Sequence, residues 1–285
     1  MTSLAACTEA IPAPLLEAKV REALEEDLGP GGVDVTSEAV VPASLQADAL
    51  IIAKAEGVLA GAPAAVEVFR QVDPAVRIQF QVDDGARVVP GTPVATVAGS
   101  LRGVLRAERT ALNFLQQLSG VATLTRRYVD AAPGVTVLNT RKTVPGLRAF
   151  QRYAVAVGGG TNHRRGLSSA VLIKDNHVAA AGGVSAALAR TLGLGLPVEI
   201  EVDTLEQLDE VLAAGPPEVV LLDNMPVDTA AEAVRRVAGR TVLEVSGGVT
   251  LATVGAYAAT GVDRISIGEL THSAPALDLS LEVTL

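Results

Sequence analysis

Polar residues and glycines follow six short apolar runs in the second half of the 285-residue sequence. The runs are rich in β-branched residues, which favours strands; they are Val135–Leu138, Ala170–Ile173, Val198–Val202, Val219–Leu222, Val242–Val245 and Arg264–Ile267. The polar ends are Asn139–Lys142, Lys174–His177, Glu201 with Asp203, Asp223–Asn224, Ser246–Gly248 and Gly268–Glu269. A single polar strand end is usually a turn or a helix cap. Six of them indicate a functional site.

Cations are concentrated between Asn139 and Asp175, although the chain is acidic, with a formal net charge of −9. Arg148 and Arg152 are four residues apart, which is typical of a solvated helix face. The cations in strand-end and loop contexts are Arg141, Lys142, Arg164 and Lys174. Their positions predict a pocket for a multiply charged anion, because Arg and Lys bind carboxylates and phosphates through charge-assisted hydrogen bonds.

Carboxylates alternate along two of the apolar runs. Glu199 and Glu201 share one face of their strand, and Glu244 shares a face with Ser246, because successive strand side chains point to opposite sides. Buried carboxylates need cations or a metal. Lys174 and a divalent cation are therefore natural partners, and a purely structural internal ion network is the alternative.

The apolar runs alternate with Ala- and Leu-rich helical segments, which predicts repeated βα units and a parallel sheet. Six or seven such units favour an α/β barrel, with an open doubly wound sheet as the alternative. In a barrel the carboxyl ends of the strands converge, and active sites lie there. Late glycines such as Gly247, Gly248 and Gly268 predict a phosphate site made of backbone N–H groups.

The first hundred residues predict a separate mixed α and β domain. Leu16 to Leu28 carry apolar residues every fourth position, which indicates a helix that ends at Gly29–Gly32. Short strands are expected at Ala49–Ala53 and Val76–Val82, and a strand–turn–strand at Asp84–Val97.

A long helix is expected at residues 101–130, with Arg102, Arg106 and Arg109 crowded near its start. Cations are unfavourable at that end of a helix dipole. We therefore expect these arginines to have other partners.

Composition excludes several classes of protein. Hydrophobic residues make up 49% of the chain and charged residues 19%, which excludes a disordered chain. The negative charge and an aromatic content of 2% argue against partnership with nucleic acid or an anionic membrane. The single cysteine, Cys7, allows no intrachain disulfide and is interpreted as a bystander. No secretory signal precedes Lys19 and no membrane span is expected, so we predict a cytoplasmic protein.

Eight motifs, in this order, resemble quinolinate phosphoribosyltransferases, the decarboxylating nicotinate-nucleotide pyrophosphorylases of NAD synthesis. They are Glu108–Asn113, Asn139–Arg148, Gly158–Arg164, Leu172–His177, Glu199–Asp203, Leu222–Asn224, Ser246–Gly248 and Gly268–Ser273. Many homologues have Asp where this chain has Asn139, a departure that leaves the neighbouring basic pair intact. The similarity runs from about Leu16 to the C-terminus.

The resemblance implies a homodimer whose subunits each have two domains. Residues 1–108 would form an α/β sandwich, with the tail 273–285 packed on it, and residues 109–272 a six- or seven-stranded α/β barrel. The implied reaction transfers phosphoribosyl from phosphoribosyl pyrophosphate to quinolinate with loss of CO2, giving nicotinate mononucleotide and pyrophosphate. Mg²⁺ is the implied cofactor.

The resemblance also assigns the site residues. Those implied to hold the quinolinate carboxylates are Arg141, His163, Arg164 and Lys174, with Arg109 reaching in from the partner subunit. Those implied to bind phosphoribosyl pyrophosphate are Lys142, His272, Ser246, Gly247, Gly248 and Gly268. Glu201 and Asp223 would bind the ribose hydroxyls and Mg²⁺. The catalytic residues would be Lys142, Lys174, Glu201 and Asp223.

Two rival functions are weighed against this one. A paralogous barrel acting on another acid, such as the molybdenum-transport-associated relatives, is disfavoured by the intact set of Arg141, His163, Arg164 and Lys174. A non-catalytic phosphate-binding barrel would have lost Glu201 and Asp223, and both are present.

Overall fold

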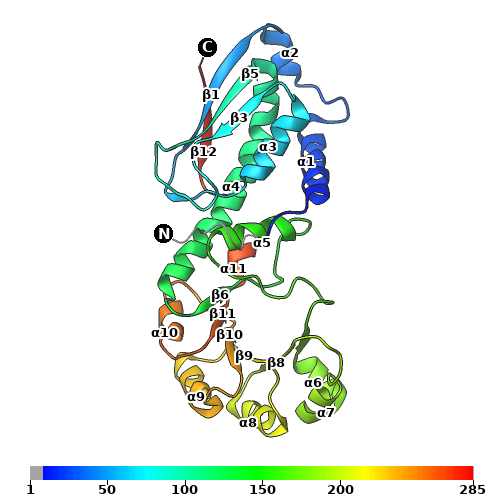
Figure 1. The fold of residues 1–285 in the computed structure, drawn as a ribbon, viewed down its shortest axis with the longest axis vertical. Coiled ribbons are helices and arrows are strands. Elements are labelled where there is room, and N and C mark those ends of the chain that lie inside the picture. Colours follow the sequence, from blue (N-terminus) through cyan, green and yellow to red (C-terminus); the bar gives the residue numbers. More distant parts are fainter. Residues whose placement is uncertain (1–8, 285) are drawn as a thin grey trace. The chain divides into compact units, whose positions relative to one another are not determined.

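The structure, a computed structural model, describes residues 9–284, so Cys7 lies outside the described residues. The chain forms two compact units, whose elements are labelled in Figure 1. The N-terminal unit contains the described residues up to Leu124, then Leu147–Gly158 and the chain from Ala274. The second unit contains Thr125–Gly146 and Gly159–Ser273.

The N-terminal unit has a four-stranded antiparallel sheet in the order β12-β1-β5-β3. The strands are β1 (Gln46–Ala53), β3 (Arg77–Phe80), β5 (Pro93–Ser100) and β12 (Leu279–Thr284). Every second residue of β1 is buried, so one face of the sheet forms the core. Three helices contribute to that core, α1 (Ala13–Leu28), α3 (Ala62–Val72) and α4 (Leu101–Ala131) (Figure 1).

The periodicity at the start of the chain predicts α1 correctly. Val20 and Leu24 are buried on it, and the helix ends at Gly29, whose φ of 67° suits glycine. It is followed by the short helix α2 (Val35–Val40), whose first turn is capped by the Asp34 side chain.

Two of the three arginines at the start of α4 have partners outside the helix, as the unfavourable helix dipole led us to expect. Arg102 donates to the carbonyls of Val41 and Glu38, and Arg106 donates to that of Val72. Arg109, in contrast, is exposed. Arg102 and Arg106 therefore fasten preceding segments to α4, whereas Arg109 does not.

Two details of this unit differ from the sequence expectation. The segment 84–97 gives β4 (Arg87–Val88) and β5, but β4 pairs with β2 (Gly57–Val58) and not with β5. Arg152, expected on a solvated helix face, is 9% exposed and forms an ion pair with Glu9. It lies in α5 (Arg148–Val157). The four-residue spacing of Arg148 and Arg152 correctly indicated a helix, but it did not show which helix face is buried.

The second unit has a six-stranded parallel sheet in the order β6-β11-β10-β9-β8-β7. Its strands are β6 (Thr136–Leu138), β7 (Val171–Ile173), β8 (Val198–Val202), β9 (Val219–Asp223), β10 (Val242–Ser246) and β11 (Arg264–Ser266). All six were expected from the sequence to within one or two residues. Strands β7 to β11 pair in chain order and β6 pairs with β11, which is the strand order of a barrel.

The barrel has a seam between β6 and β7, where no strand pairing is found among the described residues. The chain beyond β6 occupies part of this edge, because Thr161 bridges to Leu138 in parallel. The helices of the unit are α6 (Asp175–Ala181), α7 (Val184–Ala189), α8 (Leu205–Ala214), α9 (Val227–Val237), α10 (Val254–Ala258) and α11 (Glu269–His272). Figure 1 shows α8, α9 and α10 on the outer side of the strands.

The two units are joined through a helix. α4 runs without a break from Leu101 to Ala131, and the grouping of contacts changes at Leu124 within it. The boundary expected between residues 108 and 109 falls in the same helix. At the other end of the chain, β12 pairs with β1.

Candidate active site

A cavity of about 530 Å³ opens at the carboxyl ends of the barrel strands. Its lining residues come mostly from the strand ends that the sequence singled out. They are Thr140, Arg141, Lys142, His163, Arg164, Leu172, Lys174, Glu201, Leu221, Asp223, Asn224, Ser246, Gly247, Gly248 and Ser266. Among the expected site residues, Gly268, His272 and Arg109 are not in this lining.

Arg141 and Arg164 form part of the cationic wall, to which Lys142 and Lys174 also contribute. Arg141 follows β6, and Arg164 lies in the segment that bridges to β6. Arg164 Nη1 donates to the carbonyl of Ala170 at 3.1 Å. Burial and the neighbouring charge of Arg141 lower the pKa of the Arg164 guanidinium, although it stays charged at any working pH. Two neighbouring like charges favour an anionic ligand between them.

Lys174 directly follows β7, and its Nζ forms an ion pair with Glu201 Oε2 on β8. Its ammonium side chain is 45% exposed, while that of Glu201 is 11% exposed. The backbone N–H of Lys174 donates to His177 Nδ1 at 3.0 Å, so His177 fastens the first turn of α6. The carboxylate pairing expected for Lys174 is therefore present, and it involves Glu201.

Asp223 ends β9 and is held by the residue that follows it. Asn224 has a positive φ of 53°, and its side-chain Nδ2 donates to Asp223 at 2.6 Å. Its backbone N–H donates to the carbonyl of Ser246 at 2.8 Å, which links the ends of β9 and β10. Asn224 was not among the expected site residues, and its place directly after Asp223 was the available signal.

The glycines after β10 have backbone shapes that other residues adopt rarely. Gly247 has φ 87° and Gly248 has φ 64°. A Cβ on Gly247 would lie 2.2 Å from Asn224 Oδ1, whereas one on Gly248 would meet nothing within 4 Å. The turn is therefore packed against Asn224 on one side and open on the other, an arrangement in which backbone N–H groups can bind an anion.

Lys142, Gly268 and His272 lie together at the edge of the cavity. A Cβ on Gly268 would be 3.1 Å from His272 Nε2 and 3.3 Å from Lys142 Cδ. The hydroxyl of Thr271 donates to the Lys142 carbonyl at 2.8 Å.

The short helix α11, which carries Thr271 and His272, is also held from the barrel side. The buried Tyr128 hydroxyl donates to Glu269, the first residue of α11. Burial and the Glu269 carboxylate raise the pKa of Tyr128, so the phenol keeps its proton.

A buried cluster of His163, Glu199, Glu244 and Ser266 lies on the inner strand faces. His163 Nε2 is 3.1 Å from Glu199 Oε2 and 3.4 Å from Glu244 Oε1. Glu244, with 0% of its surface exposed, also accepts a hydrogen bond from the Ser266 hydroxyl. The alternation of the two glutamates was read from the sequence, but their partner is His163 and not Lys174.

The pKa values of two groups in this cluster, His163 and Glu199, are shifted. Burial would lower the pKa of His163, but hydrogen bonds and charges from Glu199 and Glu244 raise it to about 9. Burial also raises the pKa of Glu199. The Arg164 backbone N–H donates to His163 Nδ1 at 2.8 Å, which requires a lone pair there.

Comparison with known proteins decides the family. Two family models match, the quinolinate phosphoribosyl transferase N-terminal domain at residues 34–119 and the C-terminal domain at residues 121–282. The chain belongs to the quinolinate phosphoribosyl transferase family.

Known relatives from the quinolinate phosphoribosyl transferase family are similar to this chain along most of its length. A nicotinate-nucleotide pyrophosphorylase (carboxylating) of Mycobacterium leprae (strain TN) is 47% identical over 273 residues, covering 93% of this chain and 95% of the relative. A quinolinate phosphoribosyltransferase (decarboxylating) 1b of Nicotiana tabacum is 42% identical over 288 residues, which cover 94% of this chain and 82% of the relative. The solved nicotinate-nucleotide pyrophosphorylase of Francisella tularensis has a TM-score of 0.92 at 38% identity, with 100% of both chains covered.

Arg109, which the resemblance assigned to the quinolinate site, does not line the strand-end cavity. It lies on α4 in the N-terminal unit and is exposed. No ion pair joins it to Glu108, and within the described residues of its own unit it has no hydrogen-bond partner.

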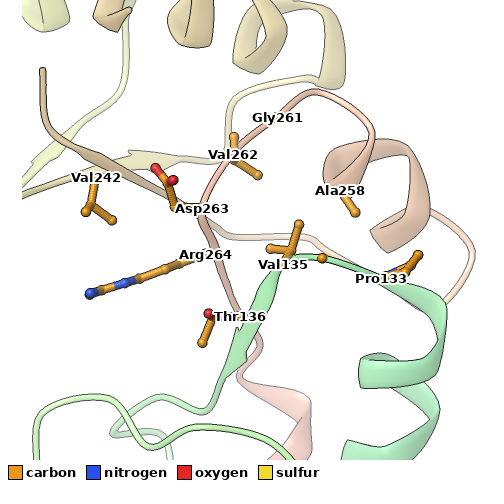
Figure 2. Close-up of a pocket in the computed structure, with 10 residues that line it drawn as sticks. Pro133, Val135, Thr136, Val242, Ala258, Gly261, Val262, Asp263 and Arg264 are labelled. Atoms are coloured by element: carbon orange, nitrogen blue, oxygen red, sulfur yellow. The ribbon is translucent and has the colours of Figure 1, made fainter. Parts of the chain in front are cut away.

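A second cavity, of about 490 Å³, lies at the opposite ends of β6, β10 and β11 (Figure 2). Figure 2 shows that the Arg264 side chain extends away from Pro133 and Val135. The amino-terminal face of a barrel generally serves stability. The strand-end cavity is therefore the candidate active site of this family member.

One further finding concerns membranes. Among residues 9–284, no helix combines the length and the apolar character needed to cross a bilayer.

Proposed function

We propose that this protein transfers the phosphoribosyl group of phosphoribosyl pyrophosphate to quinolinate, releasing pyrophosphate and CO2 and forming nicotinate mononucleotide. The proposal depends mainly on one observation, a single cavity that is lined by cations, by carboxylates and by a glycine turn. Arg141 and Arg164 suit a planar dicarboxylate, since guanidinium groups bind carboxylates bidentately. Membership of the family supports the same reaction.

The proposed chemistry needs few proton transfers from the protein. The quinolinate nitrogen attacks C1 of the ribose as the bond from C1 to the pyrophosphate oxygen breaks. The adjacent carboxylate then departs as CO2 and leaves its electron pair on the ring carbon, where the positive pyridinium nitrogen stabilises the carbanion, and that carbon takes a proton from solvent. The role of the site is therefore to align the two substrates and to stabilise charge.

Each part of the cavity has a proposed task in that reaction. Lys142 and His272 contact the leaving pyrophosphate, and the turn from Ser246 to Gly248, with Gly268, binds the 5′-phosphate. Glu201 and Asp223 accept hydrogen bonds from the ribose hydroxyls and stabilise the positive charge that develops at C1. Lys174, paired with Glu201, binds one quinolinate carboxylate.

We infer that Mg²⁺ is the cofactor and that Glu201 and Asp223 hold it. The donor set fits, because Mg²⁺ prefers carboxylate oxygens and usually binds through one or two of them together with water and substrate phosphates. Asp223 lines the cavity and has its orientation fixed by Asn224. When bound, Mg²⁺ supplies charge neutralisation for the leaving pyrophosphate.

We further infer a homodimer in which Arg109 enters the partner's cavity. Arg109 is exposed, and no hydrogen bond is found for it among the described residues, whereas Arg102 and Arg106 on the same helix both donate to backbone carbonyls; this difference supports the assignment. We infer a cytoplasmic location from the single cysteine, which fits a reducing compartment.

The test is a turnover assay with quinolinate labelled at the carboxyl carbon next to nitrogen, phosphoribosyl pyrophosphate and Mg²⁺. We expect one CO2 and one pyrophosphate for each nicotinate mononucleotide formed. Release of pyrophosphate without CO2, or no turnover of quinolinate while another acid is ribosylated, would contradict the proposal.

A further inference from the structure

Lys142 lies in an irregular segment between β6 and α5, so its position depends on contacts outside regular strands and helices. Its side chain is exposed, and among residues 9–284 no ion pair is found for its ammonium group. A long, flexible lysine side chain loses entropy when a ligand orders it. A backbone that is already fixed reduces the total cost of that ordering.

Two threonine hydroxyls hold the Lys142 backbone. The Lys142 N–H donates to Thr140 Oγ1 at 3.0 Å, and the Lys142 carbonyl accepts a hydrogen bond from the Thr271 hydroxyl at 2.8 Å. Thr140 belongs to the same segment, whereas Thr271 lies in α11, 129 residues after Lys142. The second contact therefore connects the Lys142 segment to another part of the barrel.

Thr271 is well suited to this contact. Its side chain is buried, and a β-branched side chain has few allowed rotamers, so its hydroxyl has a defined direction. The same hydroxyl is 3.3 Å from the Gly268 carbonyl, a contact that threonines often make within their own helix. A hydroxyl has one proton, and the shorter distance favours the Lys142 carbonyl as its acceptor.

The helix α11 is itself held by α4. A helix of four residues is not stable in isolation. Glu269 begins α11 and accepts a hydrogen bond from the hydroxyl of Tyr128, whose side chain is fully buried on α4. Tyr128 and Glu269 thereby fix the helix that carries both Thr271 and His272.

Lys142 and His272 lie against the same glycine in this arrangement. A Cβ on Gly268 would be 3.3 Å from Lys142 Cδ and 3.1 Å from His272 Nε2. Groups that stabilise a leaving pyrophosphate must be in place before the bond breaks. A misplacement of about 1 Å can lower the rate about a hundredfold, so the contacts that fix these two residues bear on catalysis.

We propose that Thr271, Glu269 and Tyr128 are positioning residues for binding of the leaving pyrophosphate. Thr271 acts through Lys142, whereas Tyr128 and Glu269 act through the whole of α11. Among the described residues that line the strand-end cavity, none of the three is found, so they act without touching the substrate. The inference rests on the proposed function, because it presumes that Lys142 and His272 contact the pyrophosphate.

The test measures binding to the full chain by calorimetry. The two ligands are inorganic pyrophosphate with Mg²⁺ and, separately, nicotinate mononucleotide, which has the 5′-phosphate but no pyrophosphate. Thr271→Val removes the hydroxyl and keeps the shape of the side chain. We expect it to raise the Kd for pyrophosphate about tenfold and to change the Kd for the mononucleotide less than about twofold. Thr271→Ser keeps the donor and should restore most of the affinity for pyrophosphate.

Thr241→Val is the matched control. The Thr241 hydroxyl also joins two segments, because it donates to the Pro217 carbonyl at 2.7 Å, but it does so at the amino ends of β9 and β10. We expect Thr241→Val to change neither Kd.

The decisive comparison uses a Lys142→Ala background. If Thr271 acts through Lys142, Thr271→Val should not raise the Kd for pyrophosphate further in that background. Tyr128→Phe should still raise it about threefold there, because α11 also carries His272, and should have no effect once His272→Ala is added. Where pyrophosphate binding becomes too weak for calorimetry, kcat gives the same comparison.

Three results would overturn the proposal. They are an unchanged Kd for pyrophosphate in Thr271→Val, an equal loss of both ligands, and a full effect of Thr271→Val in the Lys142→Ala background. Should Thr271→Val not fold, Tyr128→Phe must show the same selective loss of pyrophosphate. A wild-type chain that binds neither pyrophosphate nor phosphoribosyl pyrophosphate would instead contradict the proposed function itself.

Discussion

Lys174 and Glu201 form an ion pair across the carboxyl ends of the adjacent strands β7 and β8. The lysine is half exposed and the glutamate is mostly buried, so the pair presents the ammonium group to the cavity. An ion pair of this kind holds both groups in place before substrates arrive, which is what electrostatic catalysis requires.

Glu201→Gln removes the negative charge and keeps the size of the side chain. We expect kcat to fall about a hundredfold, because the carboxylate stabilises charge that exists only in the transition state. Steady-state kinetics of quinolinate turnover measure this, with Glu206→Gln on the exposed start of α8 as the control. A variant with raised KM and unchanged kcat would show that Glu201 contributes to binding alone.

Chelation should remove activity. We expect EDTA to stop pyrophosphate release and Mg²⁺ to restore it, because the leaving group needs charge neutralisation. Asp223→Asn should require a higher Mg²⁺ concentration for half-maximal activity than the wild type, while Asp228→Asn on α9 should not. Full turnover in EDTA would contradict the assignment of Asp223 and Glu201 as metal ligands.

The cavity should prefer quinolinate to nicotinate, which has one carboxylate fewer. Leaving a partly buried guanidinium without its carboxylate costs on the order of 3 kcal/mol, so kcat/KM should favour quinolinate by about a hundredfold. Competition between the two acids measures the ratio. Equal use of nicotinate would show that only one clamp operates.

Gly247→Ala tests the close contact between the glycine turn and Asn224. The new Cβ would lie 2.2 Å from Asn224 Oδ1 at a φ of 87°, so the turn must move. We expect the Kd for phosphoribosyl pyrophosphate to rise about tenfold or more, as loss of a phosphate-binding backbone geometry implies. Gly239→Ala has a similar φ of 75° with open space around it, and should leave that Kd unchanged.

Arg109 and Lys174 provide a test of the dimer. The Arg109→Ala and Lys174→Ala homodimers should each be nearly inactive if each site takes one residue from each subunit. After random subunit exchange, about half of the dimers are mixed, and each has one intact site, so activity should recover to about a quarter of wild type. Subunit exchange can be verified with two differently tagged chains. Exchange without recovery would mean that Arg109 acts within its own chain.

Much of the barrel and its cavity could be predicted from the sequence, because the signals are local. The apolar run Val198–Val202 specified a strand, and alternation within it placed Glu199 and Glu201 on one face. Since parallel strands end on the same side of a barrel, the residue types after each run were enough to predict one cationic and acidic site. The family motifs then supplied the chemistry.

The partners of these side chains were decided by tertiary structure. Alternation indicates which way Glu201 and Glu244 point, but it carries no information about distances between segments far apart in the chain. Only the fold pairs Lys174 with Glu201 and brings His163, 81 residues before Glu244 in the sequence, to a hydrogen-bonding distance from it. For the same reason the sequence predicted the turn between β4 and β5 but not the pairing of β4 with β2, which is distant in the sequence. Strand pairing and buried ion pairs depend on which distant segments can be packed together, and that is settled by the free energy of the whole chain.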